Sequence, residues 1–124
     1  MARHRFDIAS RVRYLPEQSD PAESRFAFAY TITIRNAGEV TATLLRRHWL
    51  ITDADGHEET VDGDGVIGHQ PTLAPGEVFE YTSGAVLRTP VGSMQGHYAM
   101  SAEDGTEFRA PIPVFGLTVP GVIN

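Results

Sequence analysis

Three short clusters in this 124-residue chain contain residue types that could do chemistry. The first has the GxGxxG spacing of dinucleotide-binding loops and consists of Gly63, Gly65 and Gly68. Such a loop binds pyrophosphate when a strand precedes it and a helix N-terminus follows it. Here Pro71 and Pro75 follow without a helical period, and the carboxylates of Asp62 and Asp64 would repel a phosphate. The sequence therefore favours a tight turn in which at least one glycine has positive φ, with a phosphate cradle of backbone amides as the alternative.

The second cluster is the RRHW segment at positions 46–49. In a strand, Arg46 and His48 share one face, and Trp49 lies on the other face. An Arg–His pair on a flat sheet face could hold a carboxylate or a phosphate, which makes Arg46 and His48 candidate surface contacts. The alternative is that His48 is an ordinary, partly exposed strand residue.

The third cluster could bind a cation through Asp62, Asp64 and His69. Magnesium needs few protein ligands because it keeps its waters, whereas cobalt prefers imidazole and draws attention to His57 and His69. Isolated acidic residues are common in turns because of their turn chemistry. Hydrated loop carboxylates are therefore the favoured interpretation, and direct cation binding is the alternative.

The residue types that are missing exclude several kinds of site. The chain has no cysteine, which removes thiol nucleophiles, disulfides and cysteine-ligated metal centres. All ten basic residues are arginine, so a Walker-type phosphate loop and Schiff-base chemistry are excluded as well. No serine lies in a GxSxG elbow, and we expect neither an enzyme nor a bound cofactor. The formal charge of −6 argues against nucleic-acid binding.

The sequence also indicates where the protein resides. The first residues carry charges with no apolar stretch behind them, so we expect no signal peptide and a cytoplasmic protein. The longest nearly uncharged stretch, at positions 114–123, is interrupted by glycine and proline. It is too short to span a bilayer, and we expect no membrane insertion.

The elements that position these clusters are strands. Alternation at period two is clearest over residues 26–34, where aromatic and Ile side chains share one face and Ala or Thr fills the other. Seven to eight such segments, separated by turn signals, predict an all-β, antiparallel immunoglobulin- or fibronectin type III-like sandwich. The predicted core includes four large aromatic residues, Phe28, Tyr30, Trp49 and Tyr98.

For two of the predicted strands, the alternation also predicts which side chains face the core. Over positions 41–52, Leu45 shares parity with Trp49, and Leu44 falls on the opposite face. Near the C-terminus, Val114 continues an inward-facing alternation, with prolines at 111 and 113 on the other parity. Proline cannot donate to a ladder, which predicts that this last strand lies at a sheet edge. We expect one domain over residues 1–124, with its core at about 6–115 and a tail at 116–124.

Six segments in this order resemble the ApaG (CorD) family, whose domain occurs in small bacterial proteins and recurs in eukaryotes. The matching segments are FAFAY (26–30), RHW (47–49), VDGDGVIGHQP (61–71), FEY (79–81), GSMQGHYAM (92–100) and IPVF (112–115). The resemblance covers residues 12–115 and implies the same sandwich fold.

The resemblance also implies a function. Bacterial members are associated with cobalt resistance and magnesium efflux, and similar domains occur in an F-box protein and in a polymerase-delta-interacting protein. No enzymatic activity comes with it. We therefore expect a non-enzymatic binding module that acts through a protein partner, as a monomer or weak dimer. The alternatives are a nucleotide- or pyrophosphate-binding protein that uses the glycine loop, and a direct binder of divalent cations.

Overall fold

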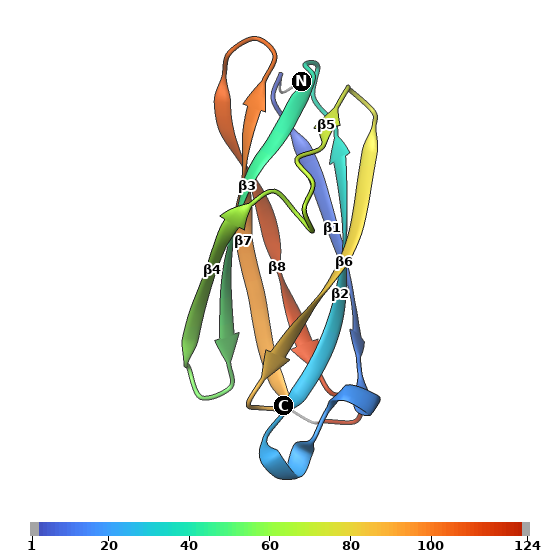
Figure 1. Ribbon diagram of the computed structural model, residues 1–124, viewed down its shortest axis with the longest axis vertical. Coiled ribbons are helices and arrows are strands. Elements are labelled where there is room, and N and C mark those ends of the chain that lie inside the picture. The colour runs from blue at the N-terminus through green and yellow to red at the C-terminus, as the bar shows by residue number, and fades with distance from the viewer. Residues whose placement is uncertain (1–2, 123–124) are drawn as a thin grey trace.

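Eight strands form two antiparallel sheets that face each other in a computed structural model, which describes residues 3–122 (Figure 1). The strands are β1 (Phe6–Tyr14), β2 (Phe26–Asn36), β3 (Ala42–Asp53), β4 (Glu58–Asp64), β5 (Thr72–Leu73), β6 (Val78–Leu87), β7 (Val91–Ala102) and β8 (Glu107–Thr118). Within the described residues, the helical elements are two 3-10 turns, η1 (Pro16–Gln18) and η2 (Pro21–Glu23). None of the helices in this range has the length and apolar character needed to cross a membrane.

The strand order is that of a fibronectin type III-like sandwich. One sheet has the order β1-β2-β6, and the other has the order β4-β3-β7-β8, with the short β5 also paired to β3. Every neighbouring pair is antiparallel. The predicted all-β sandwich is thus confirmed.

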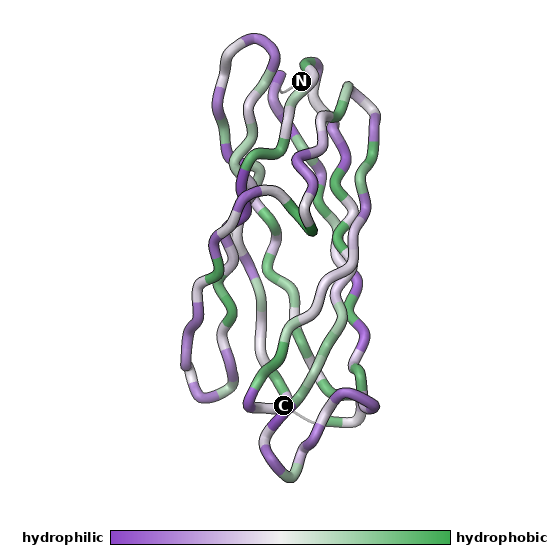
Figure 2. The backbone as a smooth tube through the Cα atoms, in the orientation of Figure 1, coloured by the Kyte–Doolittle hydropathy of each residue, from purple (hydrophilic) through white to green (hydrophobic). Residues whose placement is uncertain are grey.

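The core lies between the sheets because each strand alternates apolar and polar residues. Along β2, Phe28, Ile32 and Ile34 are fully buried, whereas Thr31 and Thr33 lie on the opposite face. Figure 2 shows hydrophobic and hydrophilic residues alternating along the strands, with hydrophilic residues in several end turns. This period-two burial is what holds the two sheets together.

Trp49 of β3 occupies the centre of this core, with 2% of its surface exposed. Its indole packs edge-on against the rings of Tyr30, Tyr98 and Phe115, at centroid distances of 5.4, 6.4 and 5.9 Å. Among the described residues its Nε1–H has no hydrogen-bond partner. The hydroxyl groups of Tyr98 and Tyr81 share a buried hydrogen bond of 2.6 Å, and burial raises the pKa of Tyr81 to about 12. Both sheets therefore meet around one aromatic cluster.

Strand β3 contains a β-bulge at Leu45, and the bulge decides which side chains reach the core. The register against β7 shifts between Leu44 and Arg46, so Leu45 is an extra residue on β3. Leu44 and Trp49 are consequently both buried, although regular alternation would place them on opposite faces. The expectation that Leu45 shares the core-facing side with Trp49, opposite Leu44, is wrong for this reason.

A second register shift changes which side chains of β8 face the core. The register of β7 with β8 shifts between Met94 and Gly96, so that the extra residue on β8 reverses its alternation. Val114 is 62% exposed, and the fully buried Leu117 takes the inward side instead. The expected inward position of Val114 is therefore wrong, and the buried core extends beyond residue 115. β8 does lie at the edge of its sheet, where the exposed Pro111 needs no ladder partner for its nitrogen.

The loop between β4 and β5 crosses toward the three-stranded sheet and is fastened to the bulge (Figure 1). The N–H of Gly65 donates to the carbonyl of Leu45 over 2.8 Å. Val66, which is fully buried, and His69 exchange two backbone hydrogen bonds that close a tight turn. Gly65 has φ of 61° and Gly68 has φ of 81°, which confirms the expected positive φ in this glycine loop.

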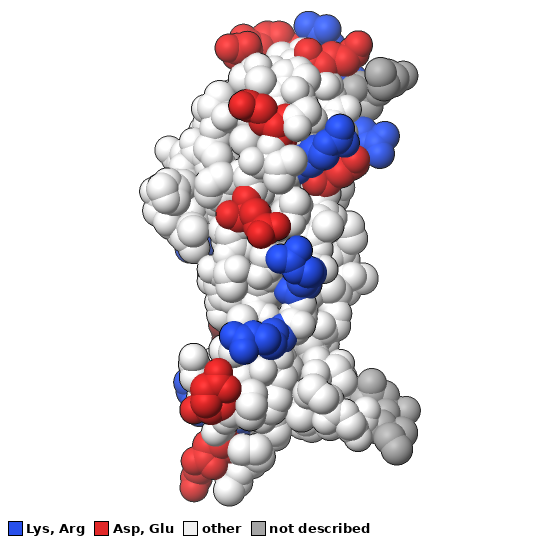
Figure 3. Space-filling model, turned by 90° about the vertical axis from the view of Figure 1, so that its right-hand side faces the viewer, with Lys and Arg blue, Asp and Glu red and all other residues white. Residues whose placement is uncertain are grey.

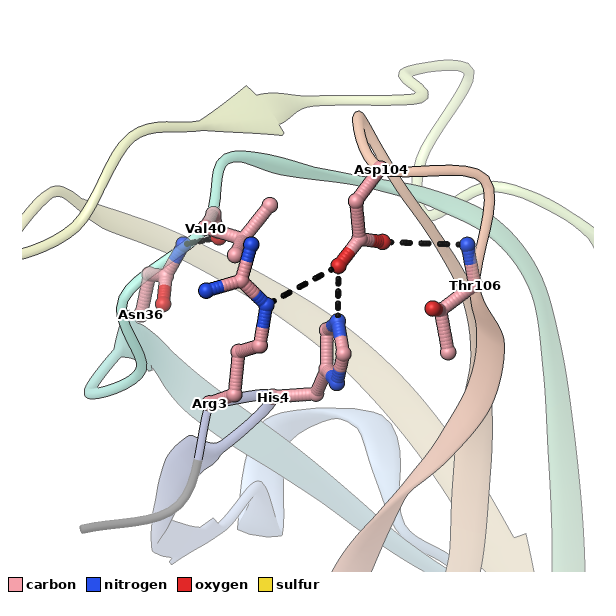
Figure 4. A network of polar contacts seen from close by, with 6 residues as sticks. All are labelled: Arg3, His4, Asn36, Val40, Asp104 and Thr106. Carbon is pink, nitrogen blue, oxygen red and sulfur yellow. Dashed lines mark hydrogen bonds and ion pairs between the residues drawn. The ribbon is translucent and has the colours of Figure 1, made fainter.

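The N-terminal segment ties the turns at one end of the sandwich together (Figure 4). Asp104, in the turn between β7 and β8, accepts hydrogen bonds from Arg3 Nε at 3.2 Å and from the Thr106 N–H at 3.0 Å, and lies 2.8 Å from His4 Nε2. The Thr106 N–H, followed by His4, holds the pKa of Asp104 well below its usual range. The Glu39 N–H donates to the carbonyl of Arg3, which links the turn between β2 and β3 to the same segment.

Removing the central indole should destabilise the fold strongly. Trp49→Ala would leave a cavity among three aromatic rings, and we expect a loss of about 3–5 kcal/mol in the free energy of unfolding. Urea denaturation followed by circular dichroism measures it. A loss below about 1 kcal/mol would contradict the central position of Trp49.

The stability cost of an alanine in the glycine loop should depend on the backbone geometry of the position that is changed. At Gly65 an added Cβ would collide with the His69 carbonyl oxygen and force a positive φ on alanine, whereas at Gly68 the space is open and only φ is unfavourable. We expect Gly68→Ala to cost about 1 kcal/mol and Gly65→Ala to cost more, equally with and without ATP. Thermal unfolding measures both. A wild-type stabilisation by ATP that Gly65→Ala abolishes would instead show a nucleotide site.

Candidate functional site

A pocket of about 410 Å³ opens on the outer face of the five-stranded sheet, the face turned away from the core. Strands β3, β4, β7 and β8 all contribute to it. Its lining is dominated by charged and imidazole side chains and consists of Arg46, Arg47, His48, Asp62, Gly63, Asp64, His97, Ala99 and Arg109. Most of these residues belong to two neighbouring rungs of the sheet, where a rung is a row of directly opposed residues on adjacent strands.

The first rung places two arginines on either side of a small residue. The strand registers align Asp64 of β4 with Arg46 of β3, Arg46 with Ala99 of β7, and Ala99 with Arg109 of β8. Directly opposed residues in an antiparallel sheet share a face, so both arginine side chains project from the outer face on either side of Ala99. The small side chain of Ala99 is what leaves the hollow between them.

The second rung contains a stacked histidine pair. Asp62 of β4, His48 of β3 and His97 of β7 are aligned in that order. His48 Nδ1 lies 2.7 Å from Asp62 Oδ1, and the rings of His48 and His97 stack with centroids 5.0 Å apart. The carboxylate of Asp62 thus orients His48, which in turn presents its ring face to His97.

The surroundings of His97 disfavour its charged form. Desolvation, followed by the charges of Arg109 and His48, lowers the pKa of His97 below its ordinary value. The opposing effect of Asp62 is the smallest of the four causes. Desolvation thus contributes most to keeping this imidazole neutral, and Arg109, which adds to the effect, would favour an anion at the same place.

The guanidinium group of Arg47 binds the backbone beside the pocket instead of projecting into its opening. Its Nη1 donates to the carbonyl oxygens of Asp64 and Gly65, both at 3.0 Å. A Cβ at Gly63 would lie 2.6 Å from this guanidinium. A Cβ at Gly63 would therefore displace the Arg47 guanidinium, whereas at Gly65 both the positive φ and the His69 carbonyl oppose a side chain.

Arginines lie on both outer faces of the sandwich, and only some of them form ion pairs. On the three-stranded sheet, which Figure 3 shows with basic and acidic groups interspersed, Arg11 pairs with Glu80 and Arg35 pairs with Asp7. Within residues 3–122, neither Arg46 nor Arg109 has a carboxylate within 4.0 Å. A single unpaired arginine on a surface is ordinary. Two that flank one hollow form a candidate anion site.

Part of this site was predictable from the sequence. The alternation of the strand places Arg46 and His48 on one face, and the structure brings both to the pocket. His97 and Arg109 were not predicted, because they lie about fifty and sixty positions further along the chain and reach the pocket only through strand pairing. His97 lies within the family-like segment GSMQGHYAM (92–100), which gave no indication that its imidazole belongs to a site, and Arg109 lies outside all six such segments. The register of β3, β7 and β8 was the signal that the sequence lacked.

The residues of the other candidate clusters contact different parts of the protein. His69 lies beside Phe79 of β6, with ring centroids 6.0 Å apart, while Asp62 pairs with His48. Over the described part of the chain, no three histidine or acidic side chains are arranged to hold a metal ion. The Gly65, Val66 and His69 amides of the glycine loop donate to protein carbonyls, so these three N–H groups are not directed at a ligand.

The comparisons with known proteins agree on one family. A family model described as the ApaG domain matches residues 16–102. Protein ApaG of Ralstonia nicotianae is 56% identical over 124 residues, which is 100% of each chain. Protein ApaG of Pseudomonas paraeruginosa is 57% identical over 121 residues, covering 98% of this chain and 96% of that protein.

The fold of a solved relative agrees as well. The crystal structure of the ApaA protein from Bordetella pertussis superposes with a TM-score of 0.94 at 45% identity, covering 98% of each chain. These full-length similarities, together with the domain match, show that the chain belongs to the ApaG family.

Proposed function

We propose that this chain is a non-enzymatic binding module whose outer five-stranded face docks an acidic protein partner. The observation that carries the proposal is the pair of arginines, Arg46 and Arg109, that flank Ala99 without an ion-pair partner among the described residues. Guanidinium groups bind carboxylates and phosphates through paired hydrogen bonds. Arginine is also enriched among the residues that dominate protein interfaces.

The composition of the pocket supports binding rather than catalysis. Its lining residues include no serine, threonine or tyrosine that could serve as a nucleophile. The His48–Asp62 pair resembles half of a catalytic triad, but both side chains are open to solvent, at 36% and 68% exposure. We assign this pair to the orientation of the imidazole and not to proton transfer.

The family's association with cobalt resistance and magnesium efflux gives the module a context. We propose that the module contributes to these processes by binding a protein partner, and we expect it in the cytoplasm. The scattered positions of His69 and Asp62 support an indirect link to divalent cations. The internal hydrogen bonds of Gly65 and Val66 in the glycine loop likewise disfavour the nucleotide-binding alternative.

Partner capture should depend on the two arginines. We expect the double variant Arg46→Ser/Arg109→Ser to retain the fold and to lose at least about tenfold of the partner captured by wild type from the native cell, because the anchoring charges are gone. Quantitative mass spectrometry of immobilised-protein pull-downs measures this loss. Capture by wild type should also weaken as salt is raised.

The matched control is Arg13→Ser, which removes an exposed arginine of β1 on the opposite outer face. We expect this variant to capture the partner as wild type does. Equal capture by the double variant and by wild type would show that the partner docks elsewhere.

Magnesium and cobalt should leave the free protein unchanged. Because the described residues offer no three-ligand cluster, we expect no shift in Tm beyond about 1 °C with either cation at matched ionic strength. Differential scanning calorimetry checks this. A saturable rise in Tm that Asp64→Asn or His69→Ala abolishes would establish direct cation binding and refute the indirect link.

A further inference from the structure

The anion pocket has an acidic wall, and this wall limits which anion fits. On the outer face, Arg46 and Arg109 face two carboxylates, Asp62 and Asp64. Arg47 aligns with Gly63, and its guanidinium lies where a Cβ of Gly63 would be, on the other face of the sheet. The four charges of the outer face therefore sum to zero with neutral imidazoles. A carboxylate ligand adds one negative charge to this balance, whereas a phosphoryl dianion adds two in the same space.

The histidines do not readily offset this added negative charge. Desolvation and the nearby charges of Arg109 and His48 lower the pKa of His97, so a neutral imidazole is favoured near neutral pH. His48 is already engaged with Asp62 at 2.7 Å. The pocket is therefore better matched to a singly charged anion than to a doubly charged one.

Asp64 is the acidic residue best placed to discriminate. It aligns with Arg46 in the first rung, on the side away from Ala99. Its backbone carbonyl accepts a hydrogen bond from Arg47, but within residues 3–122 its carboxylate has no hydrogen bond or ion pair. The charge of Asp64 therefore acts on whatever anion enters the pocket, and its repulsion is twice as large for a dianion as for a monoanion.

We propose that this pocket is selective for a carboxylate over a phosphoryl group and that Asp64 is the residue that sets the selectivity. The inference rests on the proposed docking face and specifies the chemical group through which the partner binds it. The anchoring group is the carboxylate of an acidic side chain or of a chain terminus. A phosphorylated residue or a nucleotide phosphate is disfavoured in the same pocket.

Titration with small anions tests the proposal without knowledge of the partner. Amide and imidazole shifts at Ala99 and His97 are followed by NMR at pH 7.5 and constant ionic strength. The probes are methyl phosphate, N-acetylglycine for a terminal carboxylate, and N-acetylaspartate methylamide for a side-chain carboxylate. We expect both carboxylates to bind wild type more tightly than methyl phosphate does, and the tighter of the two identifies the source.

The variant Asp64→Asn gives the sharper result. If it raises the affinity for a carboxylate by some factor, it should raise the affinity for dianionic methyl phosphate by about the square of that factor, because the Coulomb energy scales with ligand charge. The matched control is Asp55→Asn, in the turn between β3 and β4, about 20 Å along the hairpin. That distance exceeds the Debye length at physiological salt, so we expect no change in either affinity.

The outcomes separate this inference from the proposed function. Tighter binding of methyl phosphate to wild type, an equal effect of Asp64→Asn on both anions, or no binding of any probe would overturn the selectivity. If wild type prefers phosphate and Arg109→Ser abolishes that binding, the proposed docking face would stand and only the carboxylate selectivity would be refuted. Carboxylate selectivity as expected, combined with undiminished partner capture by the double arginine variant, would instead refute the proposed function alone.

Discussion

The extra residue at Leu45 is the constraint on which the rest of the molecule depends. Without it, the alternation of β3 would place either Leu44 or Trp49 in water, because an interval of five positions reverses the face of a strand. The bulge allows both to be fully buried, and it thereby turns Arg46 outward. The aromatic core and the outer pocket are thus two consequences of one register shift.

The glycine loop supports this constraint. Gly65 and the side chain of Gln70 both donate hydrogen bonds to the Leu45 carbonyl, and the Leu44 N–H donates to Pro71. A bulge leaves backbone groups without ladder partners, and the loop supplies those partners. The GxGxxG spacing resembles a phosphate loop because both need backbone freedom, but here that freedom serves the fold. Gly63 adds the space through which Arg47 reaches the loop carbonyls.

The fold was largely predictable from the sequence, and the site was predictable only in part. The alternation of residues 26–34 and the prolines in the last strand were sufficient to predict the sandwich and its edge. Two adjacent leucines, Leu44 and Leu45, gave no sign of which one is inward, since either fits a core. The partners of Arg46 in the pocket could not be found, because the pairing that brings Arg109 to the same rung is set by distant strands.

Cross-linking of paired cysteines tests the bulge most directly, since the native chain has no cysteine. Opposed residues on adjacent strands have Cβ atoms about 4.5–5.5 Å apart, near the range that a disulfide requires. The bulged register predicts that Arg46→Cys/Ala99→Cys oxidises readily. Arg47→Cys/His97→Cys, the pair that a strand without the bulge would align, should stay reduced because the bulge places these two residues on opposite faces. The reverse pattern would contradict the register on which both the core and the pocket depend.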